Sequence, residues 1–244
     1  MRPEPFFTAP GRGEKGVALI ATLALLAAGC SKPATQKPRA ASQGAPPGLE
    51  YLPPQPGSYS LPPIQAASDG TVLDESGRRR RLFDYLGDRY VLLSFIYTRC
   101  TAAKGCPLAT AVFQMLRNRL EEEPMVAGRV RLVTLSFDPE RDTPETMYRY
   151  ASSVGVKSHG QTETWTFLTT PSRGDLEPIL DGYGQYVVRE LDADGRFTGD
   201  RSHVLKVFLI DRERRVRQIY SSAFLHPALV INDVKTLMME DAGG

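Results

Sequence analysis

The chain has 244 residues, of which 41% are hydrophobic and 24% are charged, and its formal net charge is +2. This composition is ordinary for a globular protein, and a net charge so close to zero does not indicate a polyanionic partner such as nucleic acid. Two basic runs, residues 78–81 and 212–217, flank turn signals. We expect them to be solvated faces of hairpins, with a docking surface for an acidic partner as the alternative.

The first thirty residues are expected to be an export signal rather than part of the fold. Arg2, Arg12 and Lys15 precede an apolar run over residues 17–28. At about twelve residues this run is shorter than the roughly 20 that a stable transmembrane helix needs. The segment ends in LLAAGC and is similar to a bacterial lipoprotein signal with Cys30 as the lipidated residue. This predicts an exported protein, lipid-anchored on the periplasmic face of a bacterial membrane. The alternatives are cleavage by an ordinary signal peptidase or an uncleaved anchor.

Residues 31–60 are rich in Pro, Ala, Gln, Ser and Gly, which predicts a disordered tether. A loose coil of that length spans ~30 Å on average, enough for an anchored domain to approach a membrane-bound partner. Residues 61–241 remain, and their number suits one domain with a full hydrophobic core. Export also disfavours a nucleic-acid partner.

The elements of this domain alternate between strands and helices. Residues 71–72 and 80–82 predict a short hairpin, and the apolar run 90–97 predicts a strand buried on both faces. Pro107 opens a helix whose apolar residues recur at helical spacing. The later elements are a strand at 129–137, a helix at 144–154, a strand at 164–168, a helix at 175–182, a hairpin of 204–211 with 216–220, and a helix at 227–239. This order predicts an α/β, thioredoxin-like fold with an N-terminal β-hairpin extension.

Two cysteines lie in the loop between the first buried strand and the first long helix. Functional sites of open α/β sheets gather at the carboxyl ends of the strands, where Cys100, Cys106 and Asp138 all fall. Cys106 stands beside the helix start, so we expect its pKa to be lower than the usual ~8.5, whereas Cys100 lacks that help. A disulfide between them would close a small ring and stabilise the fold by only ~2.4 kcal/mol.

The spacing leaves the chemistry of the pair open. A plain disulfide staple is common in exported proteins, and a thioredoxin-type redox motif has two residues between its cysteines, whereas five separate these. A longer loop that contains glycine lets two sulfurs turn toward one metal ion, and two thiolates favour Cu(I). Of the three histidines, His203 is the best candidate for a third ligand, while His159 and His226 are expected at the surface.

Several segments resemble the Sco/SenC family of copper-handling, thioredoxin-fold proteins. They are GRRRRLFDYLGDRYVLLSFIYTRC, the Cys-Pro before the helix, SFDPERDTPETMYRYA and SHVLKVFLID, which together span residues 69–239 in the family's order. The resemblance implies a membrane-tethered chaperone that binds Cu(I) or Cu(II) through Cys100, Cys106 and His203. It implies delivery to the copper-bearing subunit of cytochrome c oxidase, or to another periplasmic copper or thiol protein. Asp138 would then support the site or face a partner, or else only form a turn.

The sequence departs from the family at two points. The commonest family pattern is Cys-x3-Cys-Pro, and Asp is frequent where Ser202 precedes the histidine. The main alternative function is a thiol-disulfide oxidoreductase in which Cys100 and Cys106 are the redox-active pair, so whether the protein is an enzyme stays open. A thiol peroxidase is disfavoured, because peroxiredoxins have Thr three residues before the reactive Cys, where this chain has Tyr97 or Ala103. A binding domain stapled by a disulfide is the remaining alternative.

Overall fold

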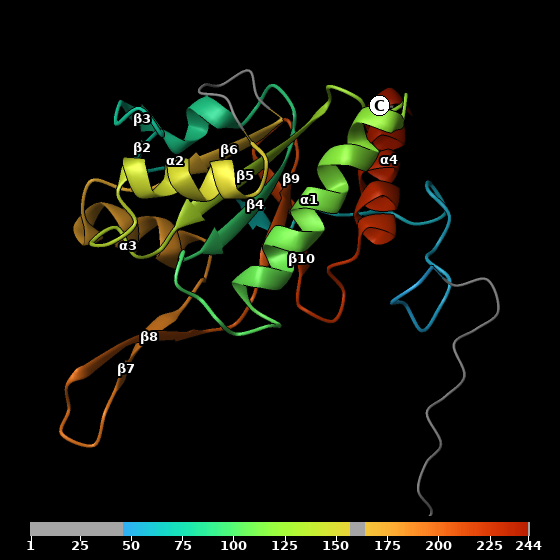
Figure 1. Ribbon diagram of the computed structural model, residues 1–244. Helices are drawn as coiled ribbons and strands as arrows, with labels where there is room; N and C mark the ends of the chain where they lie inside the picture. Colours follow the sequence, from blue (N-terminus) through green and yellow to red (C-terminus); the bar gives the residue numbers. More distant parts are fainter. Residues whose placement is uncertain (1–45, 157–163, 244) are drawn as a thin grey trace, which may run out of the picture. The chain divides into compact units, whose positions relative to one another are not determined.

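The computed structural model describes residues 46–156 and 164–243. Its centre is a six-stranded sheet in the order β1-β10-β9-β4-β5-β6, shown in Figure 1. The strands β4, β5 and β6 are parallel, β9 is antiparallel to β4, β10 to β9, and β1 to β10. The strands of this sheet are β1 (Gln65–Ala66), β4 (Tyr90–Ile96), β5 (Val130–Ser136), β6 (Trp165–Leu168), β9 (Val207–Ile210) and β10 (Arg215–Tyr220).

Helices cover both faces of the sheet because alternate strand residues point to opposite sides. Leu92 contacts the core under α1, α2 and α4, whereas Val91 and Leu93 contact the core under α3 and the N-terminal hairpin. The helical elements are η1 (Leu82–Tyr85), α1 (Cys106–Glu122), α2 (Pro144–Ser153), α3 (Arg173–Gly182) and α4 (Pro227–Gly243). The hairpin predicted near the start of the domain is β2 (Thr71–Leu73) with β3 (Arg79–Arg81). The expected fold class is therefore confirmed.

A second hairpin, β7 (Val187–Leu191) with β8 (Phe197–His203), extends away from the sheet in Figure 1. The sequence analysis did not predict it. Its turn is closed by Asp192, whose side chain accepts from the backbone N–H groups of Asp194 and Arg196, while Gly195 has a φ of 77°. The strand expected to begin at residue 204 starts three residues later, because 204–206 connect β8 to β9.

Part of the predicted tether packs on the domain. Residues 46–60 lie against α4: Leu49 is buried, the Tyr59 hydroxyl donates to the carboxylate of Asp233, and Asn232 donates to the carbonyl of Pro54. We call residues 46–60 the strap. Residues 1–45 lie outside the described residues, so the export signal, its Cys30 and the start of the tether stay predictions. Within the described ranges, no helix combines the length and apolar character that crossing a membrane requires.

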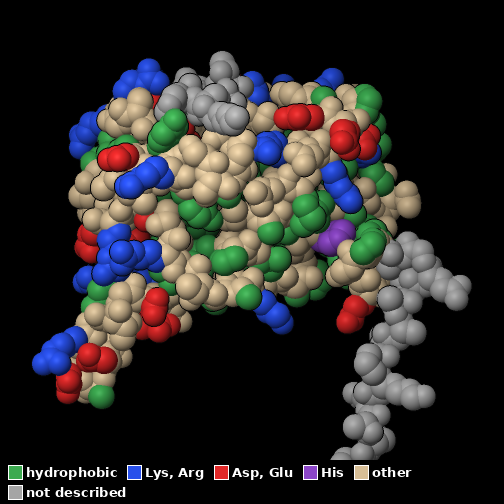
Figure 2. Space-filling model, viewed as in Figure 1, with side chains coloured by type: hydrophobic (Ala, Val, Ile, Leu, Met, Phe, Trp, Pro, Cys, Tyr) green, Lys and Arg blue, Asp and Glu red, His purple; other side chains and the backbone are tan. Residues whose placement is uncertain are grey.

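The basic runs are mostly paired within the fold. Arg78 and Arg80 contact Asp74, and Arg217 contacts both Asp211 and Glu240. The side chain of Arg217 is only 7% exposed, so the expectation of a solvated face is wrong at that residue. Figure 2 shows positive and negative side chains interspersed over the visible face.

Candidate metal centre

The loop between β4 and α1 folds its first cysteine back onto the start of the helix. Cys100 is partly buried, and Cys106, the first residue of α1, is 1% exposed. Both are free thiols. Gly105 precedes the helix, and a Cβ there would lie 3.4 Å from Sγ of Cys100 and 3.1 Å from the carbonyl oxygen of Ala102. Glycine therefore relieves a tight contact with the Ala102 carbonyl oxygen, whereas 3.4 Å from the Cys100 sulfur is an ordinary van der Waals contact.

Hydrogen bonds make Cys100, rather than Cys106, the thiolate of the pair. The sulfur of Cys100 accepts from the thiol of Cys106 and then from the backbone N–H groups of Cys106 and Ala102, which lowers the pKa of Cys100 to about 5. Donating to Cys100, together with burial, raises the pKa of Cys106. The expectation that Cys106 has the lower pKa is therefore wrong, because the thiol of Cys106 donates to the sulfur of Cys100 and is itself buried.

His203, the last residue of β8, lies beside the cysteines. Its Nε2 is 3.7 Å from Sγ of Cys106, and its ring centroid is 4.8 Å from that of Phe137 and 6.2 Å from that of Tyr97. Its Nδ1 lies 3.5 Å from the carbonyl oxygen of Arg201. Because a carbonyl only accepts, Nδ1 carries the proton and the lone pair of Nε2 faces Cys106.

The three candidate donors are close together, although they do not yet form a complete coordination shell. Among residues 46–156 and 164–243, no three His, Cys, Asp or Glu side chains already have the arrangement of a metal site. The sulfurs of Cys100 and Cys106 contact each other, and His203 approaches the second of them. Two sulfurs and one imidazole are soft to intermediate donors, which is the donor chemistry that copper prefers.

Asp138 lies two residues after the end of β5 and does not face solvent. It is 1% exposed and forms an ion pair with Arg201, whose side chain is fully buried. The guanidinium of Arg141 lies 3.8 Å from the other oxygen of the same carboxylate. Asp138 also closes a turn, because its carbonyl accepts from the N–H groups of Arg141 and Asp142. Its burial fits a supporting role and leaves no exposed carboxylate for a partner to contact.

Of the other two histidines, only His226 belongs to the described residues, and it does not contact this centre. Nδ1 of His226 accepts from the N–H of Ala228 near the start of α4, so its Nε2 donates to the carbonyl of Pro47 in the strap, 3.0 Å away. His226 therefore holds the strap on α4. His159 lies outside the described residues.

Two functional residues escaped the sequence analysis, namely Asp142 and Arg201. Asp142 is 1% exposed and accepts from the backbone N–H and the hydroxyl of Thr98, two residues before Cys100. The second Asp of the DPERDTP stretch was the available signal for Asp142. For Arg201, the signal was the DADG turn, which could have identified β8 and so placed residue 201 on the same strand as His203.

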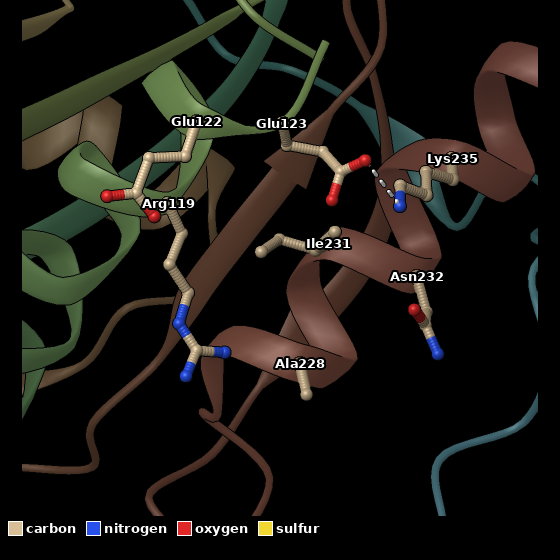
Figure 3. Close-up of a pocket in the computed structure, with 7 residues that line it drawn as sticks. All are labelled: Arg119, Glu122, Glu123, Ala228, Ile231, Asn232 and Lys235. Atoms are coloured by element: carbon tan, nitrogen blue, oxygen red, sulfur yellow. Dashed lines mark ion pairs between the residues drawn. The ribbon is translucent and has the colours of Figure 1, made fainter. Parts of the chain in front are cut away.

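One cavity of the described structure lies away from the cysteine edge. The cavity between α1 and α4, with a volume of about 450 Å³, is drawn in Figure 3. Arg119, Glu122, Glu123 and Lys235 line it, and Glu123 and Lys235 form an ion pair of 3.0 Å. Its charges are balanced, and no sulfur or imidazole is among its lining groups, so the cysteine edge is the better candidate.

Together, the fold and this edge define a thioredoxin-like protein with a dithiol and an adjacent histidine at the carboxyl ends of the strands. The family model described as SCO1/SenC matches residues 64–239. This match covers well over half of the chain, so the protein belongs to the SCO1/SenC family.

Individual relatives agree with this assignment. The SCO1 protein homolog of Bacillus subtilis is 25% identical over 167 residues, which are 68% of this chain and 79% of the homolog. The crystal structure of Arabidopsis thaliana ScoI with copper bound matches with a TM-score of 0.58 at 20% identity, over 71% of this chain and 99% of that one. The structure of BsSco matches with a TM-score of 0.56 at 24% identity, over 73% and 96%. BsSco is described as having a disulfide switch and as a member of the Sco family of cytochrome c oxidase assembly proteins.

Proposed function

We propose that this protein is a membrane-tethered copper metallochaperone. Cys100 and Cys106 bind Cu(I), and His203 joins them for Cu(II). The observation that carries the proposal is the approach of Nε2 of His203 to Sγ of Cys106, 3.7 Å, beside a thiolate at Cys100. Soft sulfur donors select Cu(I), whereas imidazole suits Cu(II) as well. Family membership and the copper-bound Arabidopsis relative support this assignment.

The delivery step is a ligand exchange in which copper is the cargo. Cys100 is the more accessible sulfur, so a partner's thiolate or imidazole first displaces Cys100 and the buried Cys106 leaves last. The acceptor we propose is the copper-bearing subunit of cytochrome c oxidase, or another periplasmic copper or thiol protein. The description of BsSco as an assembly protein for that oxidase supports this choice. The lipoprotein-like signal supports attachment through Cys30 to the periplasmic face of a bacterial membrane.

An anaerobic titration tests the ligand set. The reduced chain carrying Cys30→Ser keeps only the two site thiols, and we expect it to bind one Cu(I) per chain. Cys100→Ser and Cys106→Ser should each abolish this binding, whereas His203→Ala should abolish the sulfur-to-copper absorption of the Cu(II) form. His226→Gln is the matched control, because His226 contacts the strap. Undiminished Cu(I) uptake in either cysteine variant would contradict the proposal.

A second function is favoured by the unequal acidity of the two thiols. The Cys100 thiolate can attack a partner's disulfide, and Cys106 then displaces the partner from the mixed disulfide. The partner gains two thiols and this protein gains a disulfide, which an external dithiol reductant must reopen. A reductase activity that survives His203→Ala and is lost in Cys100→Ser would identify this thiol-disulfide oxidoreductase function. A dithiol bound to copper cannot perform it, so the two functions use the same pair in alternate states.

A further inference from the structure

The turn between β5 and α2 contacts both halves of the proposed centre. On one side, Asp142 accepts from the backbone N–H of Thr98 at 3.0 Å and from its hydroxyl at 2.6 Å. Thr98 opens the cysteine loop, two residues before Cys100. The hydroxyl of Ser136 donates to the same carboxylate at 2.5 Å. The carboxylate of Asp142 thus fixes the start of the cysteine loop.

On the other side, the same turn holds the strand that carries the imidazole. Asp138 pairs with Arg201, which lies two residues before His203 and therefore on the same face of β8. The backbone N–H of Asp138 donates to the hydroxyl of Ser136 at 3.0 Å. The hydroxyl of Ser136 therefore hydrogen-bonds to both Asp142, which contacts the cysteine loop, and Asp138, which contacts β8.

Further contacts restrict where β8 can lie relative to the β5–α2 turn. Arg141 donates to the carbonyl of Gly199 at 3.1 Å, and the guanidinium groups of Arg141, Arg189 and Arg201 all lie within 5.2 Å of the ring of Phe197. Without these contacts β8 would be held weakly, because the hairpin pairs only with itself and not with the central sheet. The position of the imidazole therefore depends on side chains of the β5–α2 turn.

Stability alone does not account for the ion pair. Both partners are buried, and Nε and one terminal nitrogen of Arg201 have no hydrogen-bond partner among the described residues. A buried pair of this kind seldom stabilises a fold more than apolar side chains of the same volume would. In contrast, the charge-assisted hydrogen bond from one terminal nitrogen of Arg201 to one oxygen of Asp138 fixes where residue 201 of β8 lies.

We propose that residues 136–142 are a brace that positions the two halves of the centre separately: Asp142 sets the cysteine loop through Thr98, and Asp138 sets His203 through Arg201. The inference rests on the proposed copper function for its metal readouts. The brace itself exists in the metal-free protein and can be tested there. Asp138, Asp142 and Arg201 are positioning residues, since they act through the residues that hold the thiols and the imidazole.

The histidine arm is tested with the double variant Asp138→Leu with Arg201→Met in the full chain carrying Cys30→Ser. It removes both charges at similar volume, so the fold should persist. In the metal-free protein, the ring resonances of His203 report its position, because the rings of Phe137 and Tyr97 shift them. We expect these resonances to move toward those of an exposed imidazole. Cu(II) affinity should fall by about 10- to 100-fold, the usual effect of lost ligand support, with Cu(I) affinity unchanged.

The cysteine arm is tested with Asp142→Asn, which places an amide against the donors of Thr98 and Ser136. We expect Cu(I) affinity to fall by about tenfold and the pH midpoint of Cys100 alkylation to change, while the His203 resonances stay in place. Arg196→Met is the matched control for both arms. It removes a cation of the same hairpin that pairs with Asp194 at the turn, away from residues 136–142, so every readout should match the unmodified chain.

The outcomes separate the brace from the copper function. If His203→Ala leaves the Cu(II) spectrum unchanged, the copper ligand set fails, and the metal-free resonances of His203 alone decide on the brace. His203 resonances that do not move in the double variant would overturn the brace. A variant of either arm that changes the His203 resonances and the Cu(I) affinity equally would overturn it too, because the two arms would then not act separately. Should the double variant not fold, Arg201→Lys keeps the positive charge but loses the planar guanidinium that lies over Phe197 and reaches Asp138. It should shift the His203 resonances in the same direction by less, and unshifted resonances overturn the brace there too.

Discussion

The strongest quantitative expectation concerns the ionisation of Cys100. With its pKa lowered from 9.0 to about 5, its thiolate outnumbers its thiol by about a hundred to one at pH 7, two units above the midpoint. The hydrogen bond from Cys106 is the largest cause of this shift. Cys106→Ala removes that donor and keeps the two backbone N–H donors. The midpoint of Cys100 should therefore rise by about one unit or more and stay below 9.

The assay is the alkylation of the reduced chain carrying Cys30→Ser by iodoacetamide between pH 4 and 9, with the modified residue located by mass spectrometry. The rate should reach a plateau above about pH 6 in the unmodified pair and at higher pH in Cys106→Ala. The midpoint is the quantity to compare, because the intrinsic nucleophilicity of a thiolate falls as its pKa falls. Cys100→Ala removes the hydrogen bond that most raises the pKa of Cys106, but Cys106 should still react slowly below pH 9, because burial limits its access and also raises its pKa. Preferential alkylation of Cys106 with a low midpoint would refute the assignment of the thiolate to Cys100.

Two further expectations concern stability. Burial raises the pKa of Asp233, so the stability that this residue contributes is present below about pH 4 and is lost as the pH rises through its raised value. The melting temperature of Asp233→Asn, relative to the unmodified protein, should therefore increase from pH 4 to pH 7, and a decrease would contradict the raised pKa. Leu116→Ala should lower the free energy of unfolding by about 2–5 kcal/mol, because Leu116 is fully buried between α1 and the sheet. Urea denaturation measures this loss. A loss below about 1 kcal/mol would contradict the expectation, because it would mean that the core around α1 closes the cavity left by the shorter side chain.

Most of the central sheet could be predicted because its signals are local. The strand β4 is an almost continuous apolar run, β5 is rich in Val and Leu, and Pro107 with its helically spaced apolar residues marks α1. The β7–β8 hairpin lacked such a signal, since most of its residues are exposed and no apolar face repeats along it. The strap was also missed, because a segment rich in proline was expected to be disordered, whereas its few anchors, such as Leu49 and Tyr59, bind α4.

The amino-acid sequence by itself determined that two thiols share one strand-to-helix loop, because Cys100 and Cys106 are close along the chain and the helix start is a local feature. Only the tertiary structure decided which sulfur is the thiolate, since this depends on which thiol donates to the other and on how deeply each is buried. It also decided that His203 reaches Cys106 across 97 positions, and that Asp138 meets Arg201 across 63. Local patterns specify periodicity and helix ends, whereas contacts between distant segments follow from the paths of the strands that carry them.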